Sequence, residues 1–119
     1  MTVVSSVKRI EPHLSQSTIG TTPVLRVTGD IDLGTIPYFA QTLFRTVDDH
    51  LGQPIALDLD EVGTLDDVGL GIILGAAGRA RAHDGELVVI ISRSTLMQRL
   101  AITGFNRAVK CVGSLHELQ

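Results

Sequence analysis

Three short acidic segments contain the residues of this sequence that could carry chemistry: Gly29-Asp30-Ile31-Asp32, Asp58-Leu59-Asp60 and Asp66-Asp67. Carboxylates serve as nucleophiles, as general acids and bases, as metal ligands, or as the acidic half of a contact with a basic protein surface. The first two segments follow strand-like apolar runs, and the third opens a long apolar helix pattern. If the two strands are neighbours, the carboxylates cluster at one sheet edge. Such a cluster could bind a basic protein surface. It is equally typical of solvent-exposed carboxylates, one of which caps a helix.

The second segment, extended to Glu61-Val62, is the sharpest enzyme-like signal. It is similar to the D-x-D-x-V/T pattern of haloacid-dehalogenase-type phosphotransferases, in which the first Asp is a nucleophile and the second works with it on Mg²⁺. That chemistry also needs a lysine and further acidic metal ligands downstream. After Leu65 the chain offers only Lys110 as a lysine. We therefore expect this segment, with Asp58 and Asp60, to be the end of a strand whose aspartate has solvated neighbours. We expect no metal and no cofactor.

Other candidates for catalysis or metal binding lack the spacing that their chemistry requires. The histidines are scattered, without paired cysteines, at positions 13, 50, 83 and 116, so they give no zinc-type ligand set. The glycines after Asp67 fall inside a helix pattern rather than directly after a strand, which excludes a dinucleotide loop. We expect them to let that helix pack close to a sheet. The single cysteine, Cys111, excludes an intrachain disulfide and is typical of a packed thiol.

The composition is that of one globular domain. The 119 residues are 44% hydrophobic and 19% charged, enough to bury a core without disulfides or metal. Aromatic residues make up only 3%, so the core must be aliphatic. The net charge of −3 and the lack of a basic stripe argue against a nucleic-acid partner. No signal peptide or membrane-length apolar run is present, so we expect a cytoplasmic protein with no membrane contact. We expect one domain over 1–119, with residues 1–6 loose.

Strand patterns alternate with helix patterns along the chain. The apolar periodicity predicts strands at 7–14, 24–28, 55–59, 87–91 and 109–112, and helices at 35–50, 67–83, 95–103 and 114–118. Residues 15–23, rich in Ser, Thr and Gly, are expected to form a turn or loop, and Ser94 or Thr95 is expected to cap the third helix. This order is typical of an α/β protein with a partly parallel sheet.

Four features resemble the STAS domain of the anti-sigma factor antagonist type. The segment 29–32 resembles that family's G-E-L-D, and an aliphatic strand at 55–59 follows the first helix. Residues 64–75, TLDDVGLGIILG, resemble F-x-D-S-S/T-G-L-G-x-L-x-G. The segments 85–89 and 100–105 resemble G-G-x-L-x-V and L-x-x-x-G-L/F. The resemblance extends over nearly the whole chain from about Val7.

The resemblance implies a STAS fold: a small, mixed, partly parallel sheet of about five strands packed by about four helices. It implies binding rather than catalysis. In that family the unphosphorylated protein binds an anti-sigma factor, a kinase with an ATPase-like fold, and so frees a bacterial sigma factor for transcription. Phosphorylation of a hydroxyl between the motif Asp and Gly abolishes binding. The residues that the resemblance assigns to partner binding are Asp30, Asp32, Thr64, Asp66, Asp67, Val68, Gly69 and Leu70, with Asp32 and Asp66 supporting the switch loop.

The chain departs from the family at the phosphoacceptor. Asp67 and Val68 occupy the two positions between Asp66 and Gly69, and neither has a hydroxyl. If Val68 matches the acceptor, the site is neutral and binding is insensitive to ATP. If Asp67 matches it, the carboxylate mimics part of the phosphate charge and weakens binding permanently.

A second interpretation comes from another class of function. The domain would be a STAS scaffold or sensor that pairs with other STAS domains or binds a small ligand. A broad apolar pocket or a stable hetero-oligomer would favour this interpretation. The sequence does not determine whether the protein forms a homodimer.

Overall fold

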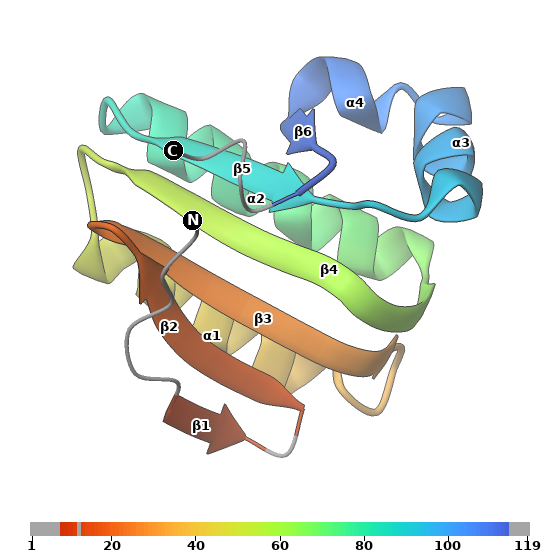
Figure 1. Ribbon diagram of the computed structural model, residues 1–119, viewed down its shortest axis with the longest axis horizontal. Helices are drawn as coiled ribbons and strands as arrows, with labels where there is room; N and C mark the ends of the chain where they lie inside the picture. Colours follow the sequence, from red (N-terminus) through yellow and green to blue (C-terminus); the bar gives the residue numbers. More distant parts are fainter. Residues whose placement is uncertain (1–7, 12, 115–119) are drawn as a thin grey trace.

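The computed structural model describes residues 8–11 and 13–114, and the side chains of residues 13–114. Within these ranges six strands form one mixed sheet in the order β1-β2-β3-β4-β5-β6. The elements, in chain order, are β1 (Lys8–Glu11), β2 (Leu14–Ile19), β3 (Thr22–Ile31), α1 (Ile36–Asp49), β4 (Pro54–Leu65), α2 (Asp67–Ala82), β5 (Glu86–Ile90), α3 (Ser94–Ile102), α4 (Phe105–Ala108) and β6 (Lys110–Val112). Figure 1 shows α1 and α2 on one face of the sheet, with α3 and α4 beyond its β5–β6 end. The expected α/β class with a mixed sheet is confirmed.

The N-terminal part of the sheet contains one more strand than expected. β1, β2 and β3 pair antiparallel, and β2 meets β3 from Leu14↔Val27 to Ile19↔Thr22. The prediction that residues 15–23 form a turn or loop is therefore wrong, apart from a tight turn that contains Gly20 at φ 60°. The central residues of β2 are Ser, Gln, Ser and Thr, all half-buried. Their polarity conceals the strand, and pairing with β3 decides its structure.

The remaining strands run parallel and carry the site. β3 pairs with β4 from Val24↔Ala56 to Ile31↔Leu65, and β4 pairs with β5, which pairs with β6. Both β3 and β4 extend beyond the predicted segments 24–28 and 55–59. The added residues include glycines and charged side chains on the exposed side, such as Glu61 and Gly63. These residues weaken the strand pattern in the sequence.

The first two helices confirm the predicted segments and build the core. α1 buries Phe39, Leu43 and Val47, and α2 buries Leu70 and Ile73 among others. These side chains pack against the aliphatic face of β3, β4 and β5 in one cluster. A second cluster covers part of the opposite sheet face and comprises Ile19, Val24, Ala56, Val88, Ile90 and Val112.

The C-terminal region differs from expectation in two respects. The residue before α3 is Arg93, and its side chain makes no capping hydrogen bond, so the predicted cap by Ser94 or Thr95 is wrong. Gly104, at φ 79°, ends α3 and turns the chain into the short helix α4, which was not predicted. The expected strand at 109–112 is confirmed as β6. The predicted helix at 114–118 and the loose segment 1–6 lie outside the described residues.

Candidate partner-binding site

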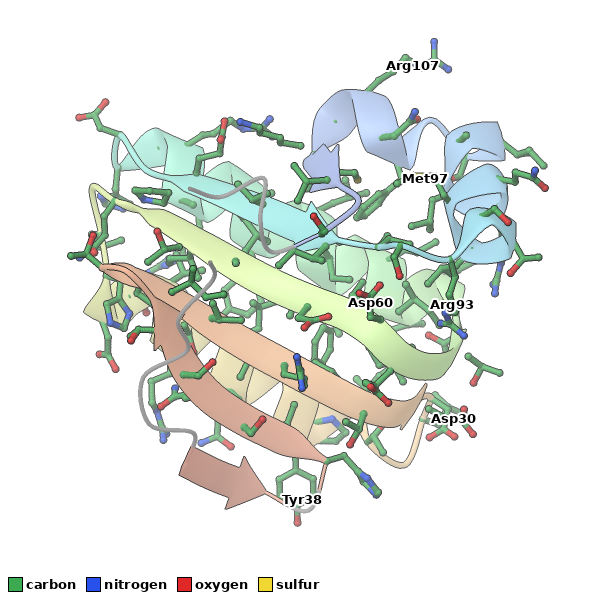
Figure 2. The ribbon with its side chains drawn as sticks, in the orientation of Figure 1. Asp30, Tyr38, Asp60, Arg93, Met97 and Arg107 are labelled. Carbon is green, nitrogen blue, oxygen red and sulfur yellow. The ribbon has the colours of Figure 1, made fainter. Side chains whose placement is uncertain are left out.

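The carboxyl ends of β3 and β4 bring two of the three acidic segments together. The strands pair to their last residues, Ile31 and Leu65, and the N–H of Asp66 donates to the Ile31 carbonyl at 3.3 Å. Asp30 and Asp32 therefore lie beside Asp66 and Asp67, where the carboxyl ends of β3 and β4 form one edge of the sheet. Figure 2 labels Asp30 at this end of β3. This juxtaposition depends on the parallel β3–β4 pairing, which no local sequence pattern determines.

Asp30 holds the last residues of β4 in place. Its Oδ1 accepts a hydrogen bond from the backbone N–H of Thr64 at 3.0 Å. The same oxygen would lie 2.5 Å from a Cβ on residue 63, so Gly63 permits the close approach. Asp30 thus fixes the segment that leads into α2, while its own side chain stays exposed.

Asp32 and Thr35 organise the turn from β3 into α1. The Asp32 Oδ1 accepts from the N–H of Gly34 at 3.0 Å, and the Asp32 carbonyl accepts from the N–H groups of Thr35 and Ile36. The Thr35 hydroxyl donates to the Asp30 carbonyl at 2.8 Å and accepts from the Asp32 N–H at 3.0 Å. These bonds pair backbone groups that the helix start would otherwise leave unpaired.

Asp66 is the N-cap of α2. Its backbone is extended, and its Oδ1 accepts from the N–H of Gly69 at 2.9 Å, while its carbonyl accepts from the N–H of Leu70. A Cβ on residue 69 would lie 2.7 Å from the Leu65 side chain and 2.8 Å from that of Ile31. Only glycine lets the first turn of α2 lie this close to β3 and β4. Of the glycines in α2, Gly71 and Gly78 face open space, so the expectation that these glycines allow close packing on the sheet holds for Gly69 and fails for those two.

The two residues between Asp66 and Gly69, which the sequence resemblance assigns to the phosphoacceptor, point outward. Asp67 is exposed in the first turn of α2, where its charge is favourable to the helix dipole. Val68 is 53% exposed. In the neighbouring β3–α1 turn Leu33 is 81% exposed. The edge therefore presents apolar side chains among carboxylates, a composition suited to a protein contact.

Asp58 does not belong to this edge. It lies in the middle of β4 with 2% of its side chain exposed, and its Oδ2 pairs with the Arg26 Nε at 3.1 Å. Its Oδ1 accepts from the N–H of Asp60 at 3.0 Å. The expectation of a strand-end aspartate with solvated neighbours is wrong, because β4 continues to Leu65. Because the Asp58 carboxylate is buried and paired with Arg26, it offers no open face to a substrate or Mg²⁺.

Asp60 and Arg93 together connect β4 with the β5–α3 turn, a contact that the sequence analysis missed. The Asp60 Oδ1 accepts from the Ser92 N–H at 2.6 Å, and the Arg93 Nη2 donates to the Val62 carbonyl. Figure 2 shows both side chains near the end of β4. Among the described residues, the Nε of Arg93 is a buried donor without a partner. No motif marks Arg93, and the pairing is visible only once β4 and β5 are neighbours.

The remaining titratable groups are dispersed. Over residues 8–11 and 13–114, no three His, Cys, Asp or Glu side chains are grouped as a metal site would require. Burial raises the pKa of the half-buried Cys111 thiol, which agrees with a packed, unreactive side chain. No helix among the described residues is long and apolar enough to cross a membrane.

The STAS domain family model matches residues 13–118. The chain belongs to the STAS domain family. Its fold is similar to that of an anti-sigma factor antagonist from Mycobacterium paratuberculosis, with a TM-score of 0.72, 21% identity, and coverage of 98% of this chain and 88% of that chain. It is also similar to unphosphorylated SpoIIAA, an anti-sigma factor antagonist, with a TM-score of 0.66, 14% identity, and coverage of 98% and 92%.

The same fold likeness holds for phosphorylated SpoIIAA, a Bacillus cell fate determinant, with a TM-score of 0.61, 14% identity, and coverage of 98% and 96%. No curated protein sequence matches the chain. At these identities the solved structures establish the STAS fold, and the family assignment agrees with the motifs at residues 29–32 and 64–75.

Proposed function

We propose that this STAS protein is an anti-sigma factor antagonist. It is a binding protein rather than an enzyme, acts in a bacterial cytoplasm, and binds an anti-sigma factor with an ATPase-like kinase fold through the edge formed by β3, β4 and the first turn of α2. The proposal rests on the different roles of the side chains at this edge. The side chains of Asp30, Asp32 and Asp66 hold the backbone, while Val68 and Leu33 are left exposed beside Asp67.

The charge of the edge defines the complementary surface. Four carboxylates lie at this edge: Asp30, Asp32, Asp66 and Asp67. The complementary surface on a partner is a basic patch around an apolar centre. Val68 and Leu33 supply the apolar contact, and the surrounding carboxylates supply orientation and association rate.

Binding does not depend on phosphorylation at the usual positions. A phosphate would bring a charge of about −1.5 to −2 and a tetrahedral group to the mouth of α2. Asp67 brings a single, smaller carboxylate, and Val68 brings none. We therefore propose that the protein binds its partner in the presence of ATP as well as ADP, with Asp67 part of the contact surface.

Two matched arginine variants test the contact surface. Val68→Arg places a long cation in the proposed apolar centre, whereas Ile102→Arg makes the same change at an 86% exposed position on α3, away from the edge. Calorimetric titration into candidate anti-sigma factors encoded in the same genome should show binding by the wild type and Ile102→Arg, and a loss of about tenfold or more in Val68→Arg. Equal affinities of the two variants would contradict the proposed surface.

A further inference from the structure

The end of α3 carries the most exposed of the large apolar side chains that the structure describes, Ile102, at 86%. The helix packs on the core through Leu96 and Leu100. Ile102 follows Leu100 by two residues, about 200° around the helix, and so faces away from the core. A single exposed apolar side chain is ordinary on a protein surface, so its surroundings decide whether it has a role.

The surroundings of Ile102 are cationic. Arg99 is exposed and lies three residues before Ile102, which places the two side chains on one face of α3. Arg107, in α4, is also exposed, and its Nη2 would lie 3.4 Å from a Cβ on residue 104, two positions after Ile102. Among the described residues neither arginine makes a salt bridge. The stretch 93–112 contains no carboxylate, and its charged residues are Arg93, Arg99, Arg107 and Lys110. We call the surface formed by Arg99, Ile102 and Arg107 the basic patch.

The edge at the ends of β3 and β4 has the opposite charge around exposed apolar side chains. Leu33, the second most exposed large apolar side chain of the described residues, is 81% exposed, and Val68 is 53% exposed. Neither 27–44 nor 54–78 contains a lysine or an arginine. We call this surface the acidic edge, and its carboxylates are those of Asp30, Asp32, Asp66 and Asp67. The basic patch and the acidic edge are therefore complementary in charge, and each has an apolar centre.

The two surfaces are separate but face the same side of the molecule. Figure 1 shows α3 and the turns that follow β3 and β4 at the right of the view. The start of α3 is held at the end of β4, because the Arg93 Nη2 donates to the Val62 carbonyl. Each surface is fixed on its own elements, so the two meet only between molecules. A twofold axis through this side would place the acidic edge of each copy on the basic patch of the other, so that the contact is made twice.

We propose that a second copy of this chain docks its acidic edge on the basic patch, and that the two copies form a twofold pair. Leu33 and Val68 of each copy contact Ile102 of the other, and the surrounding carboxylates face the two arginines. Contacts between exposed charges are individually weak and are screened by salt. The pair is therefore a reversible, salt-sensitive one rather than an obligate dimer.

Pairing covers the edge that binds the anti-sigma factor in the proposed function. Self-association and partner binding then exclude each other, so that concentrated free protein is held with its acidic edge covered. This consequence rests on the proposed function, whereas the pairing itself does not. Pairing is measured on the protein alone, so its failure would leave the proposed function standing, and a failure to bind any anti-sigma factor would leave the pair standing.

Sedimentation equilibrium of the full chain tests the pairing. At about 50 mM salt the average mass should rise from that of a monomer toward that of a dimer, and no further, between about 10 µM and about 1 mM protein. Raising the salt to about 0.5 M should weaken the association by at least about fivefold. Amide shifts on dilution, followed by nuclear magnetic resonance, should concentrate in residues 30–34, 64–68 and 99–107. A chain that stays monomeric at about 1 mM, or dilution shifts confined to other residues, would overturn the proposal.

Charge reversal assigns the contact to the two surfaces. Arg99→Glu and Asp67→Lys should each weaken the pair by at least about fivefold. The controls Arg45→Glu and Asp49→Lys make the same changes at exposed positions in the second half of α1 and should leave the association within about twofold of the wild type.

A mixture of the two reversed variants gives the sharpest test. When Arg99→Glu is mixed with Asp67→Lys, the reversed patch meets the reversed edge, and the two unchanged surfaces meet each other. Association should therefore recover to within about twofold of the wild type. The spectrum of each variant verifies its fold. Equal losses in the variants and their controls, or no recovery on mixing, would show that these surfaces do not pair.

Discussion

The Asp30 carboxylate and the Thr64 N–H are joined by a hydrogen bond of 3.0 Å between residues 34 positions apart. The bond exists because β3 and β4 run side by side and end together. It connects the strand that leads to α1 with the strand that leads to α2. The edge that we propose as the partner contact is therefore held by its own carboxylates, in addition to the strand pairing.

Gly69 and Gly71 form a matched pair for testing the packing of α2. Gly69→Ala brings its Cβ to 2.7 and 2.8 Å from Leu65 and Ile31 and should lower the free energy of unfolding by about 1–3 kcal/mol. Gly71→Ala meets nothing within 4 Å and should raise the free energy of unfolding by up to about 1 kcal/mol through helix propensity. Urea denaturation of the two variants measures both changes. Changes of the same sign would contradict the packing described for the first turn of α2.

Removal of the Asp66 side chain tests the N-cap. Asp66→Ala loses the acceptor for the Gly69 N–H and should lower the free energy of unfolding by about 0.5–2 kcal/mol. Asp66→Asn retains a capping oxygen and should cost less. Amide hydrogen exchange should be accelerated in Asp66→Ala at Gly69 and in the first turn of α2. Unchanged protection there would show that the cap does not hold the helix start.

The buried ion pair in the sheet gives a third prediction. Arg26→Met keeps the aliphatic stem but leaves the Asp58 Oδ2, on a side chain only 2% exposed, without its partner. The free energy of unfolding should fall by about 1–3 kcal/mol, the cost of an unsatisfied buried acceptor. Arg26→Lys keeps the charge and should lose less, as measured by thermal or urea denaturation. A methionine variant as stable as the wild type would mean that Asp58 needs no counter-charge.

Ionisation of Cys111 makes the free energy of unfolding depend on pH in the alkaline range. Burial raises the pKa of the native thiol, so between the ordinary thiol pKa and the raised value the unfolded chain is ionised and the native chain is protonated. The unfolded state then binds fewer protons, and this contribution to stability is lost as pH rises through the native pKa. The wild type should lose more stability than Cys111→Ala between about pH 7 and pH 10. If the free energies of unfolding of the wild type and Cys111→Ala changed with pH in parallel, this would contradict the effect of burial on the thiol pKa.

The sequence predicted those elements whose apolar pattern is strong. The periodic residues of α1 and α2 mark their faces, and the continuous run Leu87-Val88-Val89-Ile90 marks β5. β2 was missed because its centre is Ser-Gln-Ser-Thr. The ends of β3 and β4 were missed because glycine and aspartate interrupt the pattern while strand pairing continues. Tertiary pairing decides such segments.

The candidate site was only partly predictable, for the same reason. Asp30, Asp32 and Asp66 could be placed at strand and helix ends by local pattern, so their meeting required only that two strands be neighbours. Asp58 was placed at a strand end because the predicted strand stopped six residues too early, at Leu59 rather than Leu65. The contact of Arg93 with β4 depends on the packing of separate elements, which no local pattern contains.

We propose that this STAS protein binds an anti-sigma factor without a phosphorylation switch at Asp67-Val68. The most direct measurement is calorimetric titration of the wild type and of Asp67→Ser and Val68→Ser into candidate anti-sigma factors from the same genome, first with ADP and then with ATP. The affinity of the wild type should differ by less than about twofold between the two nucleotides, and at least one serine variant should lose binding with ATP. ATP-dependent loss of the wild-type complex would contradict this proposal, as would wild-type failure to bind that Asp67→Ser restores.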